Sequence, residues 1–292
     1  MAESGLPHRA GAAAILGRPN VGKSTLLNRL LGTKLAIVSP RPQTTRSRIL
    51  GILTRPNAQI LLLDTPGLHE SPKPLNAAMN QLVEKAVADC DVALVLFDLT
   101  RGWEAEESAL AERCAARGRA WLAVGTKLDL PRARSAGWPA AAHPGASLSA
   151  RTGEGVEALL EQIVRHLPES PRLYPEDALS DRPLRFLVAE LVREAAFEAL
   201  EQELPYELAV EVIEFREERA DFARIRADLL VQRASQKAIA IGAGGSMIKR
   251  IGSRARPAIE ELLRAKVHLE LWVKVEPKWA KRPKRLKSLG YS

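Results

Sequence analysis

The stretch Gly17-Arg-Pro-Asn-Val-Gly22-Lys23-Ser24 matches the pattern of a phosphate-binding loop. It follows an alanine-rich apolar run at residues 11–16 and opens a helix-forming run at 24–31, the strand-to-helix context that the motif requires. Glycines let backbone N–H groups approach phosphates, and the start of a helix favours negative charge. We expect the Lys23 ammonium to contact the β- and γ-phosphates and the Ser24 hydroxyl to bind Mg²⁺.

Apolar runs and helical segments alternate around this loop. Continuous apolar runs are typical of strands buried on both faces, and strand–helix alternation predicts a doubly wound α/β fold with a largely parallel sheet. We place this P-loop domain at residues 9–172, after a tail of residues 1–8. The expected strands are 12–16, 60–63, 92–97 and 120–124, with helices that include 24–31 and 75–88.

A proline-rich passage at residues 168–175 separates the two halves of the chain, and we place a linker at 173–183. Apolar residues then recur at helical spacing, followed by alternating and glycine-rich stretches. The pattern predicts a small α+β domain at 184–292. Its expected elements are a helix at 184–195, strands at 206–215 and 225–231, helices at 235–241 and 246–251, and a strand at 267–275.

The formal charge of +8 is concentrated at the C-terminal end of the 292-residue chain. Residues 233–292 contain 15 Lys/Arg and 4 Asp/Glu, a net charge of +11. Such a block predicts a polyanionic partner, either nucleic acid or anionic lipid, although a solvated basic tail is the alternative. The longest apolar run has six residues, far fewer than the roughly 20 of a membrane span. Cys90 and Cys114 lack metal-site spacing and fit a reducing cytoplasm.

Two patterns between residues 39 and 67 fit a nucleotide switch. A buried apolar strand at 60–63 delivers Asp64 at its end, and Gly67 follows three residues later. We expect Asp64 to hold Mg²⁺ through water and the Gly67 N–H to sense the terminal phosphate. In the polar stretch 39–46, Thr45 is our choice for a second hydroxyl on Mg²⁺.

Two later patterns indicate guanine. Asp129, in Thr126-Lys127-Leu-Asp129, can accept the ring N–H and the exocyclic amine of guanine, which adenine cannot supply together. An unmet buried acceptor costs about 1–3 kcal/mol, so this residue would discriminate between the bases. We expect the Lys127 stem to pack over the base, and Ser149-Ala150 to offer a backbone N–H to the guanine oxygen.

The predicted ligands are therefore GTP or GDP with Mg²⁺. The predicted nucleotide site comprises Gly17, Asn20, Val21, Gly22, Lys23, Ser24, Thr25, Asp64, Gly67, Thr126, Lys127, Asp129, Ser149 and Ala150. Its predicted catalytic residues are Lys23, Thr45 and Gly67, and its predicted metal ligands are Ser24, Thr45 and Asp64.

A second candidate site is the glycine-rich segment between the helices at 235–241 and 246–251. It fits the Gly-x-x-Gly loop of a KH domain, which clamps the backbone of about four nucleotides, although a glycine hinge between helices is the commoner meaning. The strands before it, the helix and strand after it, and the surrounding basic residues favour RNA binding. The predicted RNA site comprises Arg233, Lys237, Ile241, Gly242, Ala243, Gly244, Gly245, Lys249 and Arg250.

Further segments carry a family resemblance. They are Gln43-Thr-Thr-Arg46, Asp64-Thr-Pro-Gly-Leu-His69, Tyr174-Pro-Glu-Asp177, Ser180-Asp-Arg-Pro183, Glu203-Leu-Pro-Tyr206, Gln236-Lys-Ala-Ile-Ala-Ile-Gly242 and Ser288-Leu-Gly-Tyr291. Together they resemble the Era family of GTPases over nearly the whole chain. The resemblance implies a slow bacterial GTPase with a type II KH domain that binds the 3′ end of small-subunit ribosomal RNA and assists 30S subunit assembly. It also implies peripheral association with the inner membrane, and we expect a cytoplasmic monomer.

The sequence departs from relatives at two positions of the nucleotide site. Thr126 stands where such families have asparagine, so we expect it to lose the amide that joins the base loop to the P-loop and to weaken nucleotide affinity. Leu68 follows Gly67, where other GTPases have a glutamine that orients water. Similar glutamine-less GTPases seat K⁺ on the P-loop asparagine, here Asn20; the alternative is that Asn20 only bonds the loop.

Two other classes of function stay open at this point. A P-loop kinase or ATPase shares the phosphate loop, but Asp129 and the absence of an acceptor-substrate motif argue against it. A passive RNA-binding protein that holds nucleotide for structure alone would explain Thr126 and Leu68 as signs of decay. Multiple-turnover hydrolysis and competition between GTP and ATP separate these classes.

Overall fold

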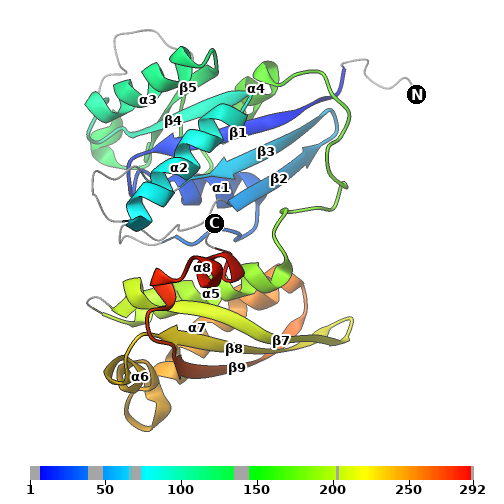
Figure 1. The fold of residues 1–292 in the computed structure, drawn as a ribbon. Coiled ribbons are helices and arrows are strands. Elements are labelled where there is room, and N and C mark those ends of the chain that lie inside the picture. Colours follow the sequence, from blue (N-terminus) through cyan, green and yellow to red (C-terminus); the bar gives the residue numbers. More distant parts are fainter. Residues whose placement is uncertain are drawn as a thin grey trace. The chain divides into compact units, whose positions relative to one another are not determined.

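The computed structural model describes residues 7–38, 49–65, 67, 74–134, 145–201 and 204–290. The chain divides into two compact units, one of residues 1–32 and 45–181 and the other of residues 33–44 and 182–292. Figure 1 shows the elements of each unit. Thr45 and Leu68 lie outside the described residues.

The first unit is an α/β sheet in the order β2-β3-β1-β4-β5-β6, with β2 antiparallel and the other strands parallel. This confirms the predicted doubly wound fold. Helices α2 and α3 cover one face of the sheet, and α1 lies behind it in Figure 1. The elements are β1 (Arg9–Gly17), α1 (Lys23–Leu31), β2 (Ile49–Arg55), β3 (Ala58–Asp64), α2 (Pro74–Asp89), β4 (Val92–Asp98), α3 (Ala105–Ala116), β5 (Ala120–Thr126), β6 (Gly145–Ser147) and α4 (Val156–His166).

Burial explains why the central strands read as continuous apolar runs. Every residue of β4 is buried, and Ala13 and Ala14 of β1 have no exposed surface. Small alanines allow helices to pack closely on both faces of β1. Because the central strands are parallel, their carboxyl ends meet at one edge, where ligands of such sheets bind.

Residues 168–181 pack against the sheet of the same unit, and residues 179 and 180 of this segment bond to the edge strand β2. The Ile52 N–H donates to the Leu179 carbonyl (2.9 Å), and the Ser180 hydroxyl donates to the Leu50 carbonyl (2.7 Å). Gln59, which is fully buried, accepts hydrogen bonds from the Leu173 and Tyr174 amides (both 2.8 Å). Leu179 and Ser180 therefore cover part of the backbone of an edge strand.

The second unit is a three-stranded sheet in the order β7-β8-β9, with β7 and β8 antiparallel and β8 and β9 parallel. Helices α5 and α7 lie behind this sheet in Figure 1. The expected strand at 206–215 begins only at Ala209, because Leu204–Glu207 forms a 3-10 turn. The elements are α5 (Leu184–Ala199), β7 (Ala209–Arg219), β8 (Phe222–Val231), α6 (Ala234–Ile241), α7 (Ser246–Leu263), β9 (Lys266–Val275) and α8 (Pro283–Ser288).

Among the described residues, no helix has the length and apolar character needed to cross a membrane. Cys90 and Cys114 are free and buried in the first unit. Burial raises the pKa of their thiols, to about 11 for Cys90 and about 12 for Cys114. Both residues therefore behave as apolar core residues.

Candidate nucleotide and RNA sites

The loop between β1 and α1 has the backbone shape that its glycines predict. Gly17 and Gly22 have φ values of 145° and 108°, and a Cβ on Gly17 would lie 2.7 Å from the Leu96 carbonyl oxygen. Asn20 is exposed and also has a positive φ, 61°. Only glycine fits at residue 17, because a side chain there would clash with β4.

Lys23 begins α1 with its ammonium turned into the loop. Its Nζ donates to the carbonyl oxygens of Gly17 (2.7 Å) and Arg18 (2.8 Å), and the residue is 7% exposed. Burial lowers the pKa of Lys23 to about 8, although the charge of Asp64 opposes this shift. Near neutral pH the ammonium is still mostly protonated, so it can attract a phosphate.

Ser24 and Asp64 meet at the carboxyl end of β3. The Ser24 hydroxyl donates to Asp64 Oδ2 (2.8 Å), while the buried Oδ1 has no hydrogen-bond partner among the described residues. Burial raises the pKa of Asp64 to about 6, against the opposing effects of Lys23, Ser24 and the Thr65 amide. The Ser24 hydroxyl and the Asp64 carboxylate, one oxygen of which is unpaired, form a ligand set that fits Mg²⁺.

Gly67 lies against the phosphate loop. A Cβ at this position would meet Pro19 Cγ at 2.8 Å and Pro19 N at 2.9 Å. The absence of a side chain therefore lets the backbone at Gly67 approach the loop, as a phosphate-sensing amide requires. Thr65 supports this region through its hydroxyl, which donates to the Ile15 carbonyl (2.8 Å).

Thr126 connects the guanine loop to the phosphate loop. Its buried hydroxyl lies 2.7 Å from the Val21 carbonyl oxygen in the phosphate loop and 3.0 Å from the Phe97 carbonyl oxygen in β4. Threonine lacks the amide of asparagine but keeps a hydroxyl that joins the base loop to the P-loop, and weaker nucleotide affinity stays a prediction. The link persists, but a hydroxyl has one hydrogen and can donate to only one of these carbonyls at a time.

Asp129 and Ser149 lie together where the sequence predicts guanine recognition. The Ser149 hydroxyl donates to Asp129 Oδ1 (2.7 Å), which orients the carboxylate. The Ser149 N–H donates to the Glu154 carbonyl (2.9 Å), whereas the Ala150 N–H has no acceptor among the described residues. Of the two predicted amides, that of Ala150 is thus available to a ligand.

Lys127 has a positive φ of 62°, and its ammonium is paired with Asp98 at the end of β4. The Nζ lies 2.6 Å from Asp98 Oδ2. Burial opposes ionisation of Asp98, but hydrogen bonds from Lys127 and Thr100 outweigh it and lower the pKa of this carboxyl. This ion pair fixes the direction of the Lys127 stem, and sequence patterns did not identify Asp98.

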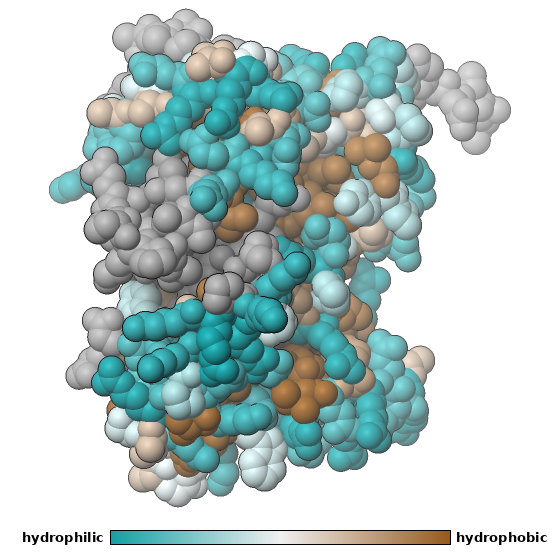
Figure 2. Space-filling model, viewed as in Figure 1, coloured by the Kyte–Doolittle hydropathy of each residue, from teal (hydrophilic) through white to brown (hydrophobic). Residues whose placement is uncertain are grey.

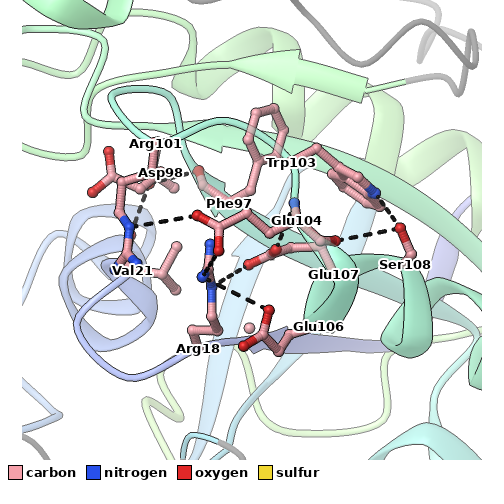
Figure 3. Close-up of polar contacts among 12 residues, drawn as sticks. Arg18, Val21, Phe97, Asp98, Arg101, Trp103, Glu104, Glu106, Glu107 and Ser108 are labelled. Atoms are coloured by element: carbon pink, nitrogen blue, oxygen red, sulfur yellow. Dashed lines mark hydrogen bonds and ion pairs between the residues drawn. The ribbon is translucent and has the colours of Figure 1, made fainter.

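Arg18 is a further residue that the motifs missed. Figure 3 shows its guanidinium directed at carboxylates near the start of α3. Its Nε donates to Glu107 Oε1 (2.6 Å) and its Nη1 to Glu104 Oε2 (2.7 Å). The Glu104 hydrogen bond is the largest cause of the raised pKa of Arg18. Because Glu107 is fully buried, the arginine anchors the phosphate loop to α3.

The glycine-rich loop of the second unit joins α6 to α7 as predicted. Gly242, Gly244 and Gly245 have φ values of 73°, 56° and 78°. A Cβ on Gly242 would lie 2.8 Å from Met247 Cβ, whereas the nearest atom to a Cβ on Gly245 is 4.0 Å away. Gly242 thus serves the fold, and the backbone at Gly245 faces open space.

Basic and apolar side chains flank this loop. Arg233, Lys237, Lys249 and Arg250 are all exposed, as are Ala243 and Gly244 in the loop itself. Ile239 on α6 is 56% exposed, and the motif did not predict this apolar surface side chain. Ile241 is only half-buried beside it. The surface offers main-chain amides, cations and an apolar patch, which suits a nucleic-acid strand.

Comparisons with known proteins match both parts of the chain. The 50S ribosome-binding GTPase family matches residues 12–127, and the KH domain family matches residues 203–280. GTPase Era of Pseudomonas putida is 45% identical, and the alignment covers 98% of this chain and 97% of that protein. GTPase Era of Xylella fastidiosa is 43% identical, with 98% of both chains covered.

Two solved structures share the fold over almost the whole chain. One is Era in complex with MgGDPNP and nucleotides 1506–1542 of 16S ribosomal RNA, with a TM-score of 0.88, 37% identity, and coverage of 98% of this chain and 99% of that one. The other is an Aquifex aeolicus Era variant bound to GDP and AlF₄⁻, with a TM-score of 0.87, 38% identity, and coverage of 97% and 99%. The chain belongs to the Era family of GTPases.

Proposed function

We propose that this chain is a GTP-dependent switch that binds small-subunit ribosomal RNA near its 3′ end and assists rRNA maturation and 30S subunit assembly. The main support for the nucleotide half is the Lys23–Ser24–Asp64 cluster at the carboxyl edge of a parallel sheet, in which Lys23 and Asp64 are buried and one Asp64 oxygen has no partner among the described residues. The RNA half is supported by the glycine loop and by a relative of 37% identity that holds 16S ribosomal RNA.

The residues of the first unit would share the work on GTP as follows. Lys23 would leave its loop carbonyls for the β- and γ-phosphates, and Ser24 and Asp64 would hold Mg²⁺ together with Thr45. Bound Mg²⁺ would neutralise charge that develops on the phosphates. The Gly67 amide would report on the terminal phosphate. Since no glutamine follows Gly67, we expect slow intrinsic hydrolysis.

Guanine selectivity would rest on Asp129, oriented by Ser149, and on the Ala150 amide. Multiple-turnover hydrolysis with competing GTP and ATP tests this half of the proposal. GTP should be hydrolysed, and excess ATP should not compete. Lys23→Ala should abolish the reaction, because the phosphates lose their buried cation. Equal competition by ATP, or the absence of turnover, would contradict the proposal.

Gly245 offers a matched test of the RNA half. Its positive φ of 78° is one that Asp and Asn tolerate, and the space around its Cβ position is open. Gly245→Asp should abolish binding of the RNA segment 1506–1542, because the carboxylate repels phosphate. Gly245→Asn, which has the same shape without charge, should retain most of the affinity, and GTP hydrolysis should be unchanged in both. Unchanged RNA affinity in the aspartate variant would remove the loop from the site.

We also propose the functional boundaries 9–172 for the GTPase domain, 173–183 for the linker and 184–292 for the KH domain. The protein would act as a cytoplasmic monomer with peripheral contact to the inner face of the membrane. The exposed basic residues Lys278, Lys281, Lys284 and Lys287 support contact with anionic surfaces. Flotation with anionic vesicles checks this, since a neutral vesicle should not bind the protein.

A further inference from the structure

Trp272 on β9 is exposed on the sheet face that carries no helix. It pairs with Asp228 of β8, and alternate residues of the two strands share its face. Its neighbour Leu271 points to the opposite face, where it packs near Gly252 of α7. Trp272 is 62% exposed, the largest fraction among the exposed large apolar side chains of the described residues. Trp272 therefore does not contribute to the hydrophobic core of the second unit.

The indole borders a hollow of about 330 Å³. The hollow is lined by Arg226, Asp228, Trp272, Val273 and Lys274. At the next position of β8, Leu230 is fully buried under the C-terminal residues Trp279 and Leu289. The C-terminal segment therefore covers one end of the sheet face and stops short of Trp272.

Three charged side chains line the hollow. Among the described residues, the side chains of Arg226, Asp228 and Lys274 make no hydrogen bond or ion pair. By contrast, charged residues further along the same face are paired. Arg224 bonds Glu218 (3.0 Å), and His268 bonds Glu270 (3.0 Å). The hollow thus presents an aromatic plane, two free cations and one free carboxylate.

We propose that this hollow binds one nucleotide of single-stranded RNA, with its base stacked on Trp272. The proposal rests on the RNA-binding function proposed above and adds a second contact point. Arg226 and Lys274 contact the phosphate backbone. Asp228 accepts a hydrogen bond from an exocyclic amine, which adenine, cytosine and guanine carry and uracil lacks. Stacking on an aromatic side chain is a common mode of single-strand binding.

Charge favours RNA over a protein partner as the occupant. Residues 233–292 carry a net charge of +11, and Figure 2 shows hydrophilic side chains gathered over α8. A polyanion with planar bases satisfies the cations and the indole together. The hollow is also distinct from the glycine loop, because α7, which begins at that loop, packs on the other face of the sheet. A strand held at both places spans more than one face of the KH domain.

The test compares variants of the full chain in binding to the RNA segment 1506–1542 and to oligo(C) and oligo(U). Trp272→Ala should weaken binding of the RNA segment about 5-fold or more, the range of one lost stacking contact. Trp272→Phe should keep most of the affinity. Asp228→Asn should reduce the preference for oligo(C) over oligo(U), and Arg226→Gln should lower the salt dependence of binding.

Controls separate this inference from the proposed function. Leu130→Ala removes an exposed apolar side chain of the first unit and should not change RNA affinity. Trp fluorescence should be quenched more by RNA in the wild type than in Trp272→Phe. If Gly245→Asp abolishes binding while Trp272→Ala binds RNA like the wild type, the inference is overturned and the proposed function stands. If the wild type binds no RNA, both fail.

Discussion

Thr126 shows how one hydroxyl can replace part of an amide. It lies between the Val21 and Phe97 carbonyls, so it joins the phosphate loop to the strand before the guanine-reading loop. Thr126→Val keeps the shape and removes the donor. We expect about 1 kcal/mol of lost stabilisation, and hence GDP affinity about 5-fold weaker in titration calorimetry. Thr126→Asn should tighten binding, because its two amide hydrogens can serve both carbonyls at once. Unchanged affinity in both variants would show that this link does not influence the nucleotide.

Asp64 makes the stability of the nucleotide-free protein depend on pH. Its pKa of about 6 lies above the unfolded value of 3.8, so folding disfavours the charged form. The stability linked to this carboxyl is therefore complete below about pH 4 and is lost as pH rises through 6. A shift of this size corresponds to about 2–3 kcal/mol. Asp64→Asn should lack this pH dependence. Lys23 has a pKa of about 8, so it stays mostly protonated over the pH range in which Asp64 titrates.

Urea unfolding at pH 4 to 7 without nucleotide measures this difference. The free energy of unfolding of the wild type should fall relative to Asp64→Asn across that range. Addition of Mg²⁺ and GDP at pH 7 should restore stability to the wild type more than to the variant, because Asp64 would then be paired with a cation. Parallel pH profiles for the two proteins would mean that Asp64 is not perturbed by burial.

At the scale of elements, the sequence predicted what is locally encoded. Strands β1, β3, β4 and β5 appear as apolar runs because both faces are buried. The edge strand β2 was not predicted, because its last three residues are only half-buried and its pairing with β3 depends on sheet order. The phosphate loop and Asp64 were found because their chemistry fixes residue types at fixed spacing. The contact between Arg18 and Glu107 was not predicted, because 89 residues separate them and only the fold brings them together.

The ion pair between the phosphate loop and α3 provides a prediction at this scale. Arg18→Gln would leave the fully buried Glu107 carboxylate without its charged partner. We expect a loss of about 2 kcal/mol or more in the free energy of unfolding, measured with urea. The double variant Arg18→Gln/Glu107→Gln should recover part of that loss, since no buried charge remains. If the two substitutions are simply additive, the pair does not act as a unit.

The proposed switch requires a connection between nucleotide state and RNA binding, and the path of the chain offers one. Residues 33–44 belong to the second compact unit, although they lie in sequence between Ser24 and Thr45. Glu194 of α5 holds this segment: its Oε1 accepts the Val38 N–H (2.9 Å), and its Oε2 lies 2.7 Å from Lys34 Nζ. Glu194 is only 4% exposed, so the carboxylate itself is shielded from water, whereas the Lys34 side chain is 38% exposed. Since residues 34 and 38 precede Thr45 in the chain and are held by α5, we expect a change at Thr45 to reach α5 along the chain.

We therefore expect RNA affinity to differ between GDP and a non-hydrolysable GTP analogue by about 5-fold or more, the usual range of such couplings. Glu194→Gln weakens both bonds to the segment and should reduce that difference, while affinity for either nucleotide without RNA stays near the wild-type value. Glu198→Gln, on the same helix, is the matched control: its carboxylate pairs with Arg254 (3.5 Å) and, among the described residues, makes no hydrogen bond or ion pair with residues 33–38. If the difference in RNA affinity is the same in Glu194→Gln and in the wild type, the two sites communicate by another route. Weaker bonds between residues 33–38 and α5 would then have no effect on the coupling.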